Sequence, residues 1–145
     1  SAGMVGGQVV DVAATGQTID LPALQHIHAL KTGALLAASV RAGVLLGGAE
    51  PAALDGLGRY GQALGLAFQI VDDLLDVEGD PSILGKATAK DEEAGKKNFV
   101  SLLGVEGAQE RVRYLAAQAK QHLASFGSRA TSLLHTVDFV LNRRH

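Results

Sequence analysis

Within the stretch FQIVDDLLDVEGD, residues 68–80, the three aspartates Asp72, Asp73 and Asp76 lie in a segment that is otherwise rich in Ile, Val and Leu. The apolar residues recur with the period of a helix and leave no consistently polar face, which is typical of a helix inside a protein. On such a helix Asp72 and Asp76 share one face with Gln69, whereas Asp73 lies on the neighbouring flank. The carboxylates are therefore expected to face a cavity or an internal partner rather than a solvated surface.

Electrostatics opposes this arrangement. The three aspartates occupy the last turns of their predicted helix, where the macrodipole disfavours each anion by roughly 0.3–1 kcal/mol. Burial of an unpaired charge costs more still. Carboxylate oxygens without Cys or His suit Mg²⁺, which takes one or two carboxylates together with waters and phosphates. A rigid helix does not wrap the larger ligand set of Ca²⁺. Two interpretations remain, which are a metal–phosphate site and a buried network with Lys and Arg side chains.

A charged segment follows, GKATAKDEEAGKK at residues 85–97. It contains the pairs Gly85-Lys86 and Gly95-Lys96, and a glycine lets the backbone approach an anion while the lysine supplies an ammonium. Asp91 lies between the pairs. Taken alone, the segment indicates a solvated loop. Beside the aspartates it predicts a clamp for a diphosphate.

Further polar residues occur in apolar surroundings nearer the start of the chain. Lys31 and Thr32 precede an apolar run, so Lys31 is expected to point into the protein, where it would hold an anion, form a salt bridge or extend its tip to water. Gln8 and Asp11 are three residues apart and share a helix face. His26 and His28 are interpreted as part of a helix surface.

Helical periodicity dominates the chain, and no convincing alternating strand is present, which predicts one all-α domain over residues 1–145. Asp20 is the expected N-cap of the second helix and Gly47-Gly48 its end. The predicted helices cover residues 1–14, 21–46, 51–77, 81–85, 91–95, 98–103, 107–125 and 128–142.

Composition excludes several classes of protein. The net charge of −2 argues against nucleic acid as a partner, and the absence of Cys excludes disulfides and Cys-ligated zinc. The absence of Cys also fits a cytoplasmic protein. The apolar region 29–49 is interrupted by Lys31 and Arg41, so it is interpreted as a packed helix, without a stable membrane span. The opening SAGMVGGQVV resembles the middle of a helix, which predicts a fragment.

The motifs, taken in order, resemble the trans-isoprenyl diphosphate synthases, the family of farnesyl and geranylgeranyl diphosphate synthases, over their C-terminal half. The resemblance rests on GGQVVD (6–11), KTG (31–33), GLAFQIVDDLLDVEGD (65–80), GK (85–86) and KDEEAGKKNF (90–99). It implies an isoprenoid synthase-type helical bundle around a central cavity, and a homodimer. It also implies Mg²⁺-dependent 1′–4 condensation of an allylic diphosphate with isopentenyl diphosphate to a short-chain product, with Mn²⁺ as a substitute metal.

The resemblance assigns roles residue by residue. It implies that Asp72 binds metal, with Asp73 and Asp76 in or near its shell and Asp91 as an outer partner. The residues implied to hold the allylic diphosphate or to line the cavity are Gln8, Asp11, Lys31, Thr32, Phe68, Gln69, Lys86 and Lys96. Lys31, Thr32, Gln69 and Asp72 are the ones expected to act on the reacting groups.

The chain departs from the family pattern at Ala89-Lys90, where a Gly is usual, and at Asn98-Phe99-Val100, where Thr/Ser-Tyr-Pro is common. Arg143-Arg144 resembles a basic tail that closes over the second substrate. No other DDxxD occurs, so the first Asp-rich motif would lie in a missing N-terminal half, and the chain alone is expected to be inactive. Two alternatives remain: a non-catalytic helical subunit that binds a full-length synthase, and a terpene cyclase or head-to-head synthase, which the GK pairs disfavour.

Overall fold

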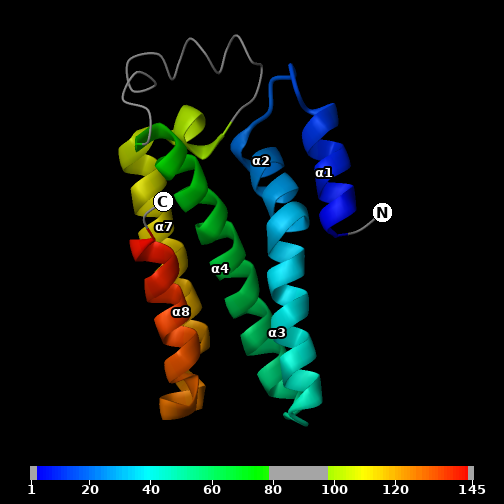
Figure 1. Cartoon of the computed structure of the whole chain (residues 1–145), viewed down its shortest axis with the longest axis vertical. Coiled ribbons are helices and arrows are strands. Elements are labelled where there is room, and N and C mark those ends of the chain that lie inside the picture. Colours follow the sequence, from blue (N-terminus) through cyan, green and yellow to red (C-terminus); the bar gives the residue numbers. More distant parts are fainter. Residues whose placement is uncertain (1–2, 79–97, 144–145) are drawn as a thin grey trace.

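The computed structural model describes residues 3–78 and 98–143, and every element in these ranges is a helix (Figure 1). This confirms the predicted all-α class. The predicted helices over 81–85 and 91–95 lie outside the described residues. The elements are α1 (Met4–Ala13), α2 (Leu21–His28), η1 (Ala29–Gly33), α3 (Ala34–Leu46), α4 (Pro51–Glu78), α7 (Phe99–His122), η2 (Ala124–Ala130) and α8 (Thr131–Asn142).

Helix α4 is the central element of the bundle. It lies between the rod formed by α2, η1 and α3 on one side and α7 with α8 on the other (Figure 1). Its buried residues contribute to both core clusters, and Ile70 and Tyr60 are almost completely shielded from solvent. The predicted helix over 51–77 is therefore confirmed, and its apolar circumference is explained by neighbours on both sides.

The rod runs from Leu21 to Leu46, as predicted. The Asp20 side chain caps it by accepting the N–H of Ala23 at 2.9 Å. The rod is not α-helical throughout, because Ala29–Gly33 forms a π-helix. The hydrophobic period did not predict this segment, since a single wide turn does not alter the pattern enough to be read from sequence.

By length and composition alone, Leu21–Leu46 could cross a membrane, and it is the one such helix in the part of the chain that the structure describes. Its mean hydropathy is 1.4, and 11% of its most apolar window is buried. Apolar core helices of soluble proteins meet the same criterion. Leu35 and Leu45 are exposed on it, and its interpretation as a packed helix stays a prediction.

Two glycines allow the helices around the rod to touch backbone to backbone. A Cβ on Gly65 of α4 would lie 2.7 Å from the Cα of Gly33, and one on Gly7 of α1 would lie 2.4 Å from the backbone nitrogen of Lys31. Such approaches are possible only without a side chain. They fix η1 between α1 and α4, which is where the predicted site residues lie.

Helix α7 begins with a capping box. The Asn98 side chain accepts the N–H of Ser101, and the Ser101 hydroxyl accepts the N–H of Asn98. Gly104 has a φ of 71°, so it kinks α7 between two helical segments, where the sequence predicted one helix to end and the next to begin. The predicted start of the last helix at residue 128 was three residues early, because η2 runs on to Ala130.

The interpretation of both histidines as surface residues was wrong for His28. His26 is exposed, whereas His28 is 7% exposed and its ring stacks on Phe99 at a centroid distance of 5.4 Å. His28 lies one helical turn beyond the buried Leu24, and its burial depends on Phe99, which is distant in the sequence.

Candidate active site

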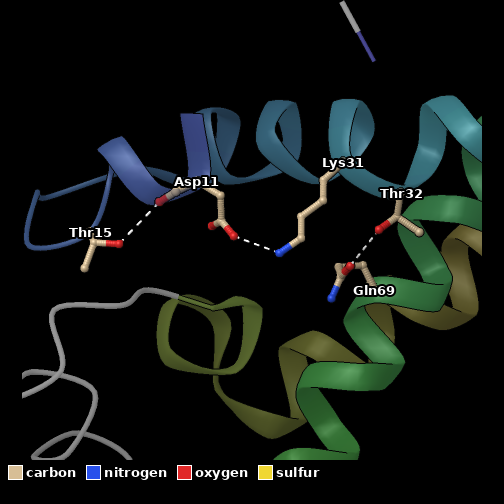
Figure 2. A network of polar contacts seen from close by, with 5 residues as sticks. All are labelled: Asp11, Thr15, Lys31, Thr32 and Gln69. Atoms are coloured by element: carbon tan, nitrogen blue, oxygen red, sulfur yellow. Dashed lines mark hydrogen bonds and ion pairs between the residues drawn. The ribbon is translucent and has the colours of Figure 1, made fainter. Parts of the chain in front are cut away.

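The first contact of the candidate site joins α1 to η1. The Nζ of Lys31 lies 2.8 Å from the Oδ2 of Asp11, and the two side chains are 30% and 13% exposed (Figure 2). Lys31 therefore points into the protein and forms an ion pair, which is the salt-bridge interpretation among those offered by the sequence. Gln8, one turn earlier on α1, is exposed.

The second contact joins η1 to α4. The Thr32 hydroxyl donates to the Oε1 of Gln69 at 3.0 Å, and both side chains are partly buried. Figure 2 shows Asp11, Lys31, Thr32 and Gln69 in one row that crosses three helices. The structure thus brings together four of the residues that the sequence singled out.

The third contact is at Asp72, one turn beyond Gln69 on the same face of α4. Its carboxylate accepts a charge-assisted hydrogen bond from Arg143, at the end of α8. The guanidinium also lies over the Phe68 ring, 4.1 Å from its centroid. Phe68 is partly buried beneath this cation and packs against the second core cluster.

The other two aspartates lie in different surroundings. Asp73 is 7% exposed, and its Oδ2 accepts the N–H of Phe99 at 2.9 Å. Asp76, one turn beyond Asp72, is exposed. The three carboxylates of the DDxxD motif thus meet a guanidinium, a helix N-terminus and solvent.

Sequence reasoning missed two of these partners. Arg143 was predicted only as part of a basic tail. No local pattern connects it with Asp72, which is 71 residues away in the sequence. The need of the Phe99 amide for an acceptor could have been predicted. Asn98 is a good N-cap, and the first N–H groups of a helix have no intrahelical acceptors.

Lys86, Asp91 and Lys96 lie outside the described residues. Within residues 3–78 and 98–143 there is no group of three His, Asp or Glu side chains placed to hold a metal ion. The donor chemistry nevertheless fits a hard cation. Asp72 already accepts a positive group, and Asp76 adds a second exposed carboxylate on the same face.

Comparison with known proteins shows that this chain is similar to prenyl diphosphate synthases. Residues 1–133 match the model of the polyprenyl synthetase family. Farnesyl diphosphate synthase of Escherichia coli (strain K12) is 42% identical over 98% of this chain and 49% of its own length. The apo structure of an FPP/GFPP synthase from Zymomonas mobilis superposes with a TM-score of 0.81 at 41% identity, over 95% of this chain and 45% of that one.

A third similar protein carries ligands. The structure of geranyltransferase from Helicobacter pylori complexed with magnesium and isoprenyl diphosphate has a TM-score of 0.73 at 28% identity, over 97% of this chain and 46% of that one.

The all-helical bundle of this chain has the fold of the isoprenyl synthases. The chain belongs to the polyprenyl synthetase family. It spans 42–49% of the length of the curated relatives first matched.

Proposed function

We propose that this chain supplies the second acidic face of a trans-prenyltransferase that joins an allylic diphosphate to isopentenyl diphosphate, head to tail. The observation that carries the proposal is the continuous row from Asp11 and Lys31 through Thr32 and Gln69 to Asp72. A cationic group, a hydroxyl, an amide and a carboxylate follow one another along this row. That order suits a substrate whose diphosphate meets the charged groups of the row and whose reacting carbons lie along Thr32 and Gln69.

Each side chain then has a task set by its position. Lys31 supplies a positive charge to the allylic diphosphate, and because Asp11 holds its ammonium at 2.8 Å it is pre-oriented. Thr32 and Gln69 fix each other by their hydrogen bond and present polar atoms along the reacting carbons. Phe68 offers a ring face toward developing positive charge once Arg143 withdraws.

Asp72 and Asp76 would hold Mg²⁺, for which Mn²⁺ can substitute. When bound, this ion would stabilise the charge on the departing diphosphate. The Helicobacter pylori geranyltransferase, complexed with magnesium and isoprenyl diphosphate, supports Mg²⁺ as the proposed metal. Lys86, Lys96 and Asp91 are proposed to complete the diphosphate and metal contacts. Farnesyl or geranylgeranyl diphosphate is the proposed product class, in keeping with the names of the relatives.

We further infer that turnover needs a first Asp-rich motif, which is not among these 145 residues, and that the working form is a cytoplasmic homodimer. The chain alone is expected to bind diphosphate without condensing substrates. Mg²⁺-dependent product formed by residues 1–145 alone would contradict this expectation.

Calorimetric titration of the full chain with inorganic pyrophosphate in Mg²⁺ tests the proposal. Asp72→Asn is expected to weaken pyrophosphate binding by about tenfold or more, since the proposed contact between the Asp72 carboxylate and Mg²⁺ is lost. The matched control is Asp55→Asn, which alters an exposed carboxylate of the same helix that is paired with Arg59. Equal affinities of the two variants would refute the role of Asp72, and a non-catalytic subunit would become the better explanation.

A further inference from the structure

Adjacent aspartates of the DDxxD motif are engaged on different sides of α4. Asp72 is 39% exposed at its side chain and pairs with Arg143, whereas Asp73 is 7% exposed and turned toward α7. Successive residues of a helix point about 100° apart, so both carboxylates cannot face the same cavity squarely. The two residues therefore do different work.

The partner of Asp73 is the start of α7. Phe99 is the first helical residue, and its N–H is one of the donors that no intrahelical carbonyl can satisfy. The capping box between Asn98 and Ser101 leaves this N–H for Asp73, whose Oδ2 accepts it at 2.9 Å. The positive end of the α7 macrodipole also favours a carboxylate at this point.

The surroundings of this contact are buried in the core. The Phe99 side chain is fully buried, and the His28 ring from α2 stacks on it. Leu74 and Ile70 of α4 belong to the same core cluster as Phe99. A bond from Asp73 to Phe99 therefore sets how the acidic turn of α4 is rotated against α7.

We propose that Asp73 is a positioning residue, not a metal ligand. Its bond to the Phe99 amide holds the acidic turn of α4 so that Asp72 and Asp76 face the substrate. The metal and the substrate rest on the proposed function, whereas the acceptor role of Asp73 rests on the observed contact with the Phe99 amide. The proposal replaces the expectation that all three aspartates share the metal's surroundings.

Three variants of the full chain separate an acceptor from a metal ligand. Asp73→Asn keeps an acceptor oxygen and removes the charge, Asp73→Leu keeps the approximate shape and removes the acceptor, and Asp72→Asn serves as the metal-site comparison. Two quantities are measured on each. One is the exchange rate of the Phe99 amide proton by NMR, and the other is the affinity for Mn²⁺ by electron paramagnetic resonance.

An acceptor role predicts rescue by asparagine. In Asp73→Leu the Phe99 amide should exchange about tenfold faster or more, since its bond is lost, while in Asp73→Asn it should stay within about threefold of wild type. Mn²⁺ affinity should stay within about twofold in Asp73→Asn and fall about tenfold in Asp72→Asn.

Two results would overturn the inference. One is a loss of Mn²⁺ affinity in Asp73→Asn as large as that in Asp72→Asn, with the Phe99 amide unchanged. The other is equal Phe99 exchange in Asp73→Leu and Asp73→Asn. If the wild-type chain bound no Mn²⁺, the proposed function would fail, and the amide measurement would still decide the role of Asp73.

Discussion

Replacement of Gly65 by Ala should separate α4 from η1 and break the contact that joins them in the candidate site. The added Cβ would lie 2.7 Å from the Cα of Gly33, whereas ordinary van der Waals contact begins near 3.4 Å. Both partners are backbone, so neither can rotate away. The helices must move apart by about 0.7 Å or distort, because packed interiors offer no spare volume.

The expected change in the free energy of unfolding is the sum of two destabilising contributions and one stabilising contribution. Overpacking costs about 1–3 kcal/mol. A separation of this size would stretch the 3.0 Å bond between Thr32 and Gln69 beyond hydrogen-bonding distance, which adds about 0.5–1.5 kcal/mol. Alanine has the better helix propensity by about 1 kcal/mol, which offsets part of this. Gly65→Ala should therefore lower the free energy of unfolding by about 1–3 kcal/mol.

Urea unfolding followed by circular dichroism measures this change. The matched control is Gly58→Ala in the same helix, where an added Cβ meets nothing within 4 Å. It should be neutral or stabilising by up to about 1 kcal/mol, from propensity alone. If Gly65→Ala were as stable as Gly58→Ala, the close crossing of α4 and η1 would not exist as described.

Three other perturbations have definite expected outcomes. Arg143→Gln should raise the Mn²⁺ affinity of the chain roughly two- to fivefold at low salt, because the partly exposed guanidinium competes for Asp72; an unchanged affinity by calorimetry would argue against that competition. Lys31→Met should weaken pyrophosphate binding by about tenfold while it keeps the buried stem, and a parallel thermal melt separates loss of charge from loss of fold. Burial raises the pKa of the Tyr60 hydroxyl above its usual 10, so the folded state favours the neutral hydroxyl. The contribution of Tyr60 to the free energy of unfolding is therefore fully present below pH 10 and is lost as the pH rises through the folded pKa. Tyr60→Phe, which loses the bond to the Leu133 carbonyl, should be less stable by about 0.5–1.5 kcal/mol near pH 7, and the gap should narrow above pH 10 in urea titrations.

Features encoded by neighbours in sequence were predictable. Asp20 was expected to cap the rod and does so, because an N-cap acts on the amide three residues ahead. The apolar circumference of α4 predicted its central place for a similarly local reason. The resemblance placed Lys31, Thr32 and Gln69 at a common site, and the structure brings them into one row.

Features that depend on distant partners could not be read in the same way. A cation was expected to offset the cost of the aspartates, but the pattern did not single out Arg143 for Asp72 or the α7 amide for Asp73. Both partners are chosen by the packing of α7 and α8 on α4. His28 was misread for the same reason, since its burial depends on Phe99, which is far away in the sequence.

Because η1 is a π-helix, the site depends on the number of residues in the rod as well as on their identities. A wide turn holds about one residue more than an α-helical turn, so the rod after Gly33 is rotated by about 100° relative to an uninterrupted α-helix. If the same residues formed an uninterrupted α-helix, either Leu24 or Val44 would turn away from the core. A sequence could thus keep every side chain of the row and still lose the row if this wide turn became α-helical.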